Sequence, residues 1–124
     1  MYIPKSPYIL CLELTKQCNI SCKHCSVNAD LNGKRELPFD KVIEIVEESK
    51  QIGIKDFVLG GGETVLYENF FELCEYILSK GISVSFITNG TLISEKIGSF
   101  LKLEKYFHFL KVGISLDGHT QELH

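Results

Sequence analysis

Three cysteines, Cys18, Cys22 and Cys25, lie within eight consecutive residues of the stretch TKQCNISCKHCSVNAD. Thiolates are soft ligands, and tetrahedral thiolate sites in proteins hold zinc or iron–sulfur clusters. Such centres usually take four protein ligands, so three thiols either lack a partner or leave one coordination position open. The spacing C-x3-C-x2-C therefore predicts a metal centre built by a single loop.

Two other interpretations of the same thiols stay open. A zinc site would need a fourth ligand, and His24 is the nearby candidate, although its place directly before Cys25 makes joint coordination awkward. Inert thiols are the third interpretation, but cysteines seldom cluster in this way without a ligand. The ligand chemistry favours an iron–sulfur cluster.

Composition restricts the classes of protein that could carry this site. With 124 residues the chain forms one domain at most, and 44% hydrophobic and 23% charged residues are typical of a globular protein. A net charge of −3 argues against nucleic-acid binding. There is no apolar run of membrane-span length and no secretion signal, so no membrane contact and a cytoplasmic location are expected. An odd number of cysteines, five, agrees with a reducing compartment.

The elements that must position the thiols alternate along the chain. Strands are predicted at 8–14, 54–59, 82–88 and 109–116. One helix begins at Pro38 and ends at Gly53, a second runs through 70–78 and ends at Gly81, and a third is capped by Ser94. This β-α-β-α-β-α-β order predicts an α/β fold with a parallel sheet.

The unusual residues follow the four predicted strands. They are the cysteine loop, GGGE at 60–63, TNG at 88–90 and SLDG at 115–118. In parallel α/β folds the chemistry lies at the carboxyl ends of the strands, so these four segments are expected to meet at one site.

Together these motifs resemble the radical S-adenosylmethionine (SAM) superfamily over essentially the whole chain. CNISCKHC at 18–25 resembles its cluster-binding signature, and LGGGE at 59–63 resembles its glycine–glycine–glutamate motif. ITNG at 87–90 and VGISLDGHTQELH at 112–124 resemble its third and fourth strand ends. The last segment is closest to the branch of peptide-modifying and cofactor- or haem-maturation enzymes. The fold implied is an incomplete parallel βα barrel of about four βα units.

The resemblance implies that Cys18, Cys22 and Cys25 hold three irons of a 4Fe–4S cluster. The open fourth iron would bind the amine and carboxylate of SAM, and an electron from the cluster would release methionine and a 5′-deoxyadenosyl radical. That radical abstracts hydrogen from the substrate. The cofactor carries this chemistry, and the protein supplies position and shielding.

The remaining site residues are also implied by the resemblance. The candidates for binding SAM are Gly61, Gly62, Glu63, Thr88, Asn89, Ser115 and Asp117. For the last four, turn formation is an equal alternative, because Asn-Gly and Asp-Gly are strong turn formers. The family commonly has proline after the glutamate, whereas this chain has Thr64, which removes a bias of Glu63 towards extended backbone.

Five further residues are expected to have structural roles or no assigned role. In the first strand, Leu10, Leu12 and Leu14 are expected to face helices, which places Cys11 and Glu13 on the interior face, with Glu13 bracing another strand. Cys11 and Cys74 are expected to pack as small hydrophobes. His119 and His124 receive no role.

A complete radical SAM core has about six βα units, so 1–124 is expected to be a truncated core that contains strands one to four. The rest of the barrel and any C-terminal domain are expected to be absent, and the fourth strand to be a free sheet edge. An interrupted gene or complementation by another polypeptide are alternatives to a fragment of a longer enzyme.

The function predicted is therefore that of the N-terminal part of a radical SAM enzyme acting on a peptide or a cofactor precursor. An electron donor such as a flavodoxin or ferredoxin is the expected partner. Two alternatives stay open, a non-catalytic iron–sulfur or zinc module and an interaction remnant that pairs through its exposed sheet edge.

Overall fold

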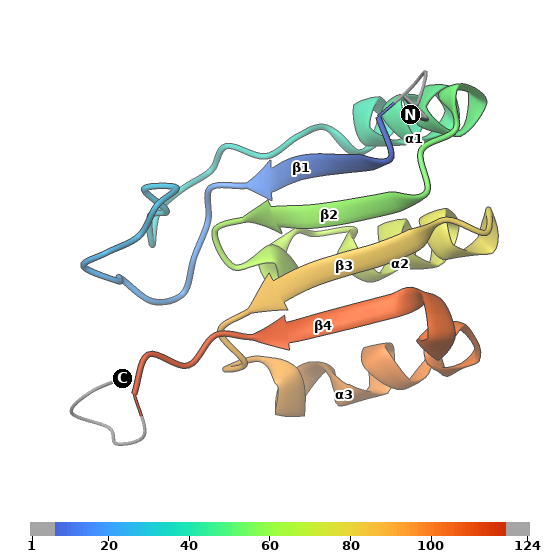
Figure 1. The fold of residues 1–124 in the computed structure, drawn as a ribbon. Helices are drawn as coiled ribbons and strands as arrows, with labels where there is room; N and C mark the ends of the chain where they lie inside the picture. Colours follow the sequence, from blue (N-terminus) through green and yellow to red (C-terminus); the bar gives the residue numbers. More distant parts are fainter. Residues whose placement is uncertain (1–6, 119–124) are drawn as a thin grey trace, which may run out of the picture.

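The computed structural model describes residues 7–118 and shows a four-stranded sheet whose helices all pack on one face (Figure 1). In chain order the elements, with η for a 3-10 helix, are β1 (Ile9–Thr15), α1 (Phe39–Ile52), β2 (Asp56–Gly61), η1 (Thr64–Leu66), α2 (Phe70–Ser79), β3 (Ser83–Thr88), α3 (Ile93–Leu101), η2 (Glu104–Phe109) and β4 (Leu110–Ile114). All three neighbouring pairs are parallel and the order is β1-β2-β3-β4. This confirms the predicted α/β arrangement of a partial βα barrel.

The helix ends show where local sequence signals decide the boundaries. Gly53 follows α1 with φ 90°, a left-handed conformation that glycine adopts without strain, and its N–H donates to helix carbonyls as predicted. Gly81 has φ 75° just after α2. The prediction for Ser94 was wrong, because α3 begins one residue earlier, at Ile93, whose N–H donates to the Gly90 carbonyl at 3.3 Å. The turn after β3 thus starts the helix, and no side chain caps it.

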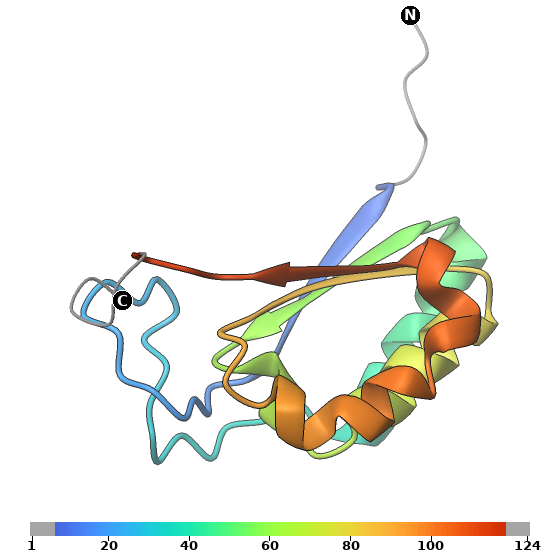
Figure 2. The same cartoon turned by 90° about the horizontal axis from the view of Figure 1, so that it is seen from below.

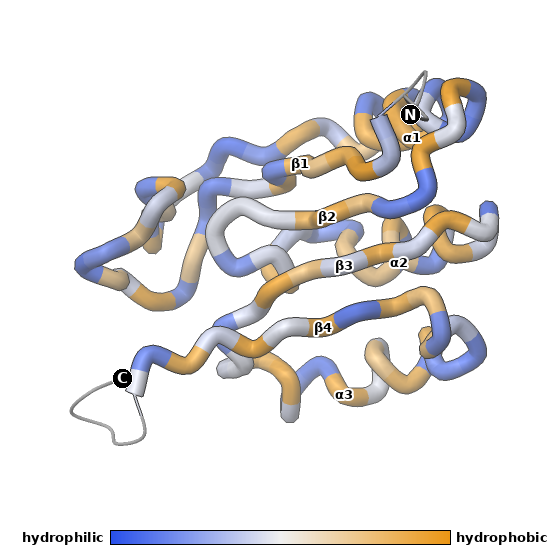
Figure 3. The backbone as a smooth tube through the Cα atoms, viewed as in Figure 1, coloured by the Kyte–Doolittle hydropathy of each residue, from blue (hydrophilic) through white to orange (hydrophobic). Residues whose placement is uncertain are grey.

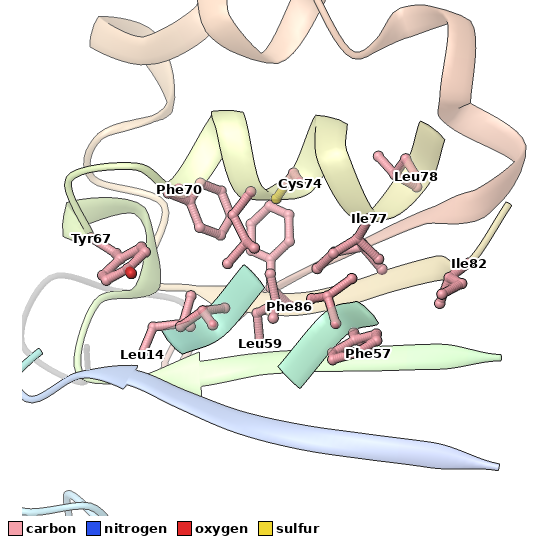
Figure 4. Close-up of a cluster of buried hydrophobic side chains, with 14 of the residues drawn as sticks. Leu14, Phe57, Leu59, Tyr67, Phe70, Cys74, Ile77, Leu78, Ile82 and Phe86 are labelled. Carbon is pink, nitrogen blue, oxygen red and sulfur yellow. The ribbon is translucent and has the colours of Figure 1, made fainter. Parts of the chain in front are cut away.

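The core fills the space between the sheet and the helices. Figure 4 shows Phe86 of β3 and Phe70 of α2 side by side, with their ring centroids 4.8 Å apart in an edge-on packing. The other large buried side chains include Leu14, Phe57, Leu59, Leu73, Cys74 and Ile77. Cys74 is fully buried, as expected. In Figure 3 the strands carry long hydrophobic stretches, whereas the loop between β1 and α1 mixes hydrophilic and hydrophobic segments.

The opposite face of the sheet has no covering layer in the part of the chain that the structure describes (Figure 2). Leu14 is buried against the helices, and Cys11 and Glu13 share the opposite face, as expected. The expectation that Cys11 packs as a small hydrophobe and that Glu13 is buried was wrong, because both are exposed. Without strands facing it across a closed barrel, this face meets solvent. The Glu13 carboxylate accordingly pairs with Lys16 at 3.1 Å instead of bracing another strand.

The strand β4 lies at the edge of the described sheet, as predicted. Its apolar residues Val112 and Ile114 are 45% and 59% exposed. Among the described residues, none of the helices has the length and apolar character needed to cross a membrane.

Candidate functional site

A pocket of about 360 Å³ lies at the carboxyl ends of the strands. Figure 1 shows that all four strands end on the same side of the molecule, next to the long loop that follows β1. The residues that line the pocket are Cys18, Cys22, His24, Cys25, Ser26, Val27, Ala29, Gly60, Gly61, Gly62, Thr64, Ile87, Asn89, Ser115 and Asp117. The structure thus brings the segments after all four strands into one site.

The three candidate metal ligands share this pocket but differ in their surroundings. Cys18 is buried, whereas Cys22 and Cys25 are half-buried. The Cys25 sulfur accepts a hydrogen bond from the Ala29 N–H at 3.3 Å, and this and neighbouring amides lower the pKa of the Cys25 thiol. Burial is the main cause that raises the pKa of the Cys22 thiol, and the negative charges of Cys18, Asp117 and Cys25 raise it further. The thiols are therefore close enough to influence one another.

The donor set fits a metal centre in its chemistry and position. Three soft thiolates come from one loop and line one pocket, which suits zinc or an iron–sulfur cluster. Within residues 7–118, however, no three His, Cys, Asp or Glu side chains converge tightly enough to hold a metal ion as they stand. Because thiolates repel one another, the ligands would gather around the positive charge of the irons.

The glycine run owes its composition to its close approach to the end of β1. Gly61 has φ 131°, and a Cβ there would lie 2.2 Å from the Thr15 carbonyl oxygen. A Cβ on Gly62 would lie 2.0 Å from the Gln17 carbonyl oxygen. The backbone instead uses this proximity for hydrogen bonds, from the Gly62 N–H to Thr15 at 2.7 Å and from the Glu63 N–H to Gln17 at 2.8 Å. Glycine at positions 61 and 62 therefore allows the end of β2 to form backbone hydrogen bonds with the start of the cysteine loop.

The carboxylate of Glu63 lies behind the pocket and does not line it. Its side chain is 2% exposed and accepts hydrogen bonds from the Thr88 hydroxyl at 2.6 Å and the Asn89 N–H at 2.8 Å. A weaker contact, 3.4 Å, comes from the Val65 N–H. These donors satisfy both oxygens of a buried charge. The structure thus places Glu63 and Thr88 as a brace between η1 and β3.

The side chain of Asn89 joins this brace to the cysteine loop. Its Nδ2 donates to the Asn19 Oδ1 at 2.9 Å, and its Oδ1 accepts from the Thr91 hydroxyl at 2.7 Å. The Asn19 Nδ2 donates in turn to the Thr91 hydroxyl at 2.8 Å. Asn19 directly follows Cys18, so this network holds the cysteine loop against the end of β3. The sequence offered no signal for Asn19 or Thr91, because their pairing joins positions about 70 residues apart.

The end of β4 closes the remaining side of the pocket. The Ser115 N–H donates to the Thr88 carbonyl at 3.0 Å, which continues the pairing of β3 with β4. The Asp117 carboxylate lies 3.3 Å from Nε2 of His24. In the sequence, His24 stands between Cys22 and Cys25. The sequence suggested His24 only as a zinc ligand, and the structure instead pairs it with Asp117. His119 and His124 lie outside the described residues.

Two larger hollows, of about 500 and 620 Å³, surround the polar loop at 27–36. Neither contains a cysteine among the residues that line it. The residues that line them include cationic side chains, with Lys34 in both hollows and Arg35 in the second. The pocket at the strand ends is therefore the candidate site for metal and cofactor chemistry.

Fold and site define a partial βα-barrel protein with a thiol-lined pocket at the carboxyl ends of its strands. A sequence profile described as the Radical SAM superfamily matches residues 12–124. The chain therefore belongs to the radical SAM superfamily, as its motifs predicted.

Similarity to individual proteins points to the same family. Mycofactocin maturase MftC of Mycolicibacterium smegmatis is 32% identical over 118 residues, which cover 95% of this chain and 29% of MftC. The AdoMet-dependent heme synthase of Methanosarcina barkeri is 30% identical over 120 residues, which cover 96% of this chain and 34% of that enzyme. The chain thus spans about a third of the length of these curated relatives.

Solved structures show the same fold. SuiB of Streptococcus suis superposes with a TM-score of 0.75 and 23% identity, in crystal structures bound to the precursor peptide SuiA or to SAM. The match covers 94% of this chain and about a quarter of SuiB, 26% and 27% in the two structures. The four parallel strands described here therefore correspond to part of a radical SAM barrel.

Proposed function

We propose that this chain supplies the cluster-binding and methionine-binding part of a radical SAM enzyme. The observation that carries the proposal is the single pocket in which three thiols meet the glycine run and the ends of β3 and β4. Cys18, Cys22 and Cys25 are the proposed ligands of three irons of a 4Fe–4S cluster. Three ligands leave the fourth iron for the amine and carboxylate of SAM.

When bound, the cluster and SAM together supply a one-electron cleavage that produces a carbon radical for hydrogen abstraction. The chain's own residues position these groups. The backbones of Gly61 and Gly62 face the pocket and can pair with the methionyl end of SAM. Ser115, Asp117 and Asn89 present polar groups from the other two strand ends, which suits the ribose.

Glu63 and Thr88 serve SAM binding in this proposal from behind the pocket. Their 2.6 Å hydrogen bond fixes the turn that begins with Gly61 and Gly62 relative to β3. A brace of this kind lowers the entropic cost of ordering the turn when a ligand arrives.

The substrate class proposed is a peptide, with a cofactor precursor as the second candidate. The peptide is supported by the likeness to a mycofactocin maturase and to SuiB, which was crystallised with its precursor peptide. The haem synthase among the relatives supports the cofactor precursor. The open face of the described sheet is where further structure could hold either substrate.

An external electron donor such as a flavodoxin or ferredoxin is the proposed partner. Residues 16–35 contain Lys16, Lys23, Lys34 and Arg35 but a single acidic residue, Asp30, in a chain with a net charge of −3. This basic loop carries the cysteines, so it would attract an acidic carrier to the place where the electron is needed. We also propose that the protein lies in the cytoplasm, because this reducing compartment keeps cysteines as thiols.

The test uses the whole chain, reconstituted with iron and sulfide under anaerobic conditions. We expect about four irons and four sulfides per chain, and an EPR spectrum of the reduced cluster that changes when SAM is added. A variant with Cys18, Cys22 and Cys25 all replaced by serine is the control, and it should bind neither iron nor sulfide. Stoichiometric zinc, or a cluster that ignores SAM, would instead support the non-catalytic metal-binding module.

A further inference from the structure

The hydroxyl of Thr64 has no hydrogen-bond partner. Thr64 is 1% exposed, and its Oγ1 is the only buried side-chain nitrogen or oxygen in this condition among the residues that the structure describes. Burying a hydroxyl without a partner costs about 1–3 kcal/mol, and native proteins contain few such groups. An unsatisfied hydroxyl at a functional site therefore suggests a partner that arrives with a ligand.

The unpaired group of Thr64 is its side-chain hydroxyl, whereas its backbone carbonyl is paired. Its carbonyl accepts a hydrogen bond from the Tyr67 N–H at 3.1 Å inside η1. The neighbouring threonine, Thr88, shows the contrast, because its hydroxyl donates to Glu63 at 2.6 Å and accepts from the Gly90 N–H at 3.1 Å. Two threonines that are buried to the same degree thus differ in whether the protein itself satisfies their hydroxyls.

Thr64 belongs to the residues that line the pocket, next to the glycine run in the chain. A hydroxyl can donate one hydrogen bond and accept two, so it can pair with either a carboxylate or an ammonium group. The glycine run is the part of the pocket proposed above to meet the methionyl end of SAM. Thr64 lies one residue beyond Glu63, whose carboxylate is already occupied by protein donors.

We propose that the Thr64 hydroxyl is a ligand-binding group of this pocket, which hydrogen-bonds the amino-carboxylate end of SAM. The inference rests on the proposed function, because it names a further residue for the same cofactor. Proline, the residue commonly found at this place in the resembling motif, has no hydroxyl and could not make the contact. Thr64 therefore gives this chain a hydrogen bond that the common motif lacks.

The test compares Thr64→Val, which removes the hydroxyl at nearly constant shape, with Thr64→Ser, which keeps it. SAM is titrated into the reconstituted protein, and the EPR change gives the concentration of half-maximal effect. We expect Thr64→Val to raise this concentration about tenfold, the equivalent of about 1.4 kcal/mol, and Thr64→Ser to stay close to the unmodified chain.

Urea unfolding of the same proteins without cluster or SAM separates binding from folding. Thr64→Val should leave the midpoint unchanged or raise it, because a buried unpaired hydroxyl is removed. The matched control Thr88→Val should lower the midpoint, because it breaks the contact with Glu63. A purely structural hydroxyl would lower stability in both variants, and that result would overturn the inference.

The two levels of proposal fail in different ways. If the unmodified chain shows no response to SAM, the proposed function is overturned and this inference with it. If the unmodified chain responds and Thr64→Val responds at the same SAM concentration, only the role of Thr64 is overturned.

Discussion

The Glu63 carboxylate accepts a hydrogen bond from the Thr88 hydroxyl at 2.6 Å, across 25 residues of sequence. This contact joins the turn after β2 to the end of β3, and the Asn89 N–H strengthens it at 2.8 Å. The turn after β2 is therefore held to the end of β3 by a buried carboxylate that lies behind the pocket, and both of its oxygens accept hydrogen bonds. Several properties of the chain should depend on it.

Replacing Glu63 with glutamine should lower the free energy of unfolding by about 2 kcal/mol. All three groups that contact the carboxylate donate to it, and glutamine keeps only one acceptor oxygen in place of two. Its amide can at best reverse the contact with Thr88, whose O–H then loses its acceptor. Urea unfolding of the cluster-free chain measures the change. Glu13→Gln is the control, because this exposed carboxylate should change stability by less than about 0.5 kcal/mol. Equal losses in the two variants would contradict a special role for Glu63.

Gly62→Ala should unfold or severely destabilise the chain. The new Cβ would lie 2.0 Å from the Gln17 carbonyl oxygen, and both groups belong to backbone that is fixed by hydrogen bonds. Gly98→Ala provides the matched control, because nothing lies within 4 Å of a Cβ at this position inside α3. Its helix propensity should rise, with a gain of up to about 1 kcal/mol. Thermal unfolding followed by circular dichroism distinguishes the two, and similar behaviour would refute the packing argument.

Asn19→Ala should loosen the cysteine loop with little effect on global stability. The variant loses the contacts to Asn89 and Thr91, both on the surface, so we expect at most about 1 kcal/mol. Amide hydrogen exchange of residues 18–25 should nevertheless accelerate. Asn69→Ala removes one surface hydrogen bond, to Glu72 at the start of α2, and should leave exchange in the loop unchanged. Unaltered exchange in Asn19→Ala would show that the network does not hold the loop.

Single substitutions of Cys18, Cys22 or Cys25 by serine should each sharply lower the iron bound after reconstitution. A 4Fe–4S cluster with only two thiolate ligands is poorly held. Cys11→Ser should bind iron like the unmodified chain, because Cys11 is exposed and does not line the pocket. Iron and sulfide analysis provides the measurement. Dependence on Cys11 would require a different ligand set.

In the cluster-free chain, iodoacetamide should modify Cys25 at lower pH than Cys22. Hydrogen bonds from backbone amides, with Ala29 first, stabilise the Cys25 thiolate and lower its pKa below the ordinary value. Burial raises the pKa of Cys22, and the nearby negative charges of Cys18, Asp117 and Cys25 add to this. The ratio of the two rates, followed by peptide mass spectrometry, should be largest at a pH below both pKa values and fall towards one as the pH rises above both. Faster modification of Cys22 at neutral pH would contradict this order.

Sequence periodicity predicted the elements well because their signals are local. The apolar stripe of α2 and the glycine after α1 reflect interactions within a few residues, and both were found. Ser94 failed as a cap because a tighter turn at Gly90 starts the helix first. Cys11 and Glu13 were assigned to a covered interior, but alternation along a strand tells only which residues share a face. Whether that face is covered depends on what lies opposite it.

The sequence by itself determined which segments meet at the site. Three closely spaced thiols, and unusual residues after each of four strands, were enough to predict one pocket at the carboxyl ends of a parallel sheet, and the structure has that pocket. Residue types and their spacing along the chain are properties of the sequence alone, so these inferences did not depend on the tertiary structure.

Only the tertiary structure decided how the polar groups divide between support and binding. The side chains of Glu63 and Thr88 were expected at the ligand, yet they pair with each other behind the pocket. Asn89 lines the pocket and also pairs with Asn19, while the Thr64 hydroxyl is left without a partner. Hydrogen bonds between residues 25 and 70 positions apart depend on strand register and loop packing. The reason is physical, because a polar side chain pairs with whatever the fold brings within about 3 Å, and no local pattern encodes that neighbour.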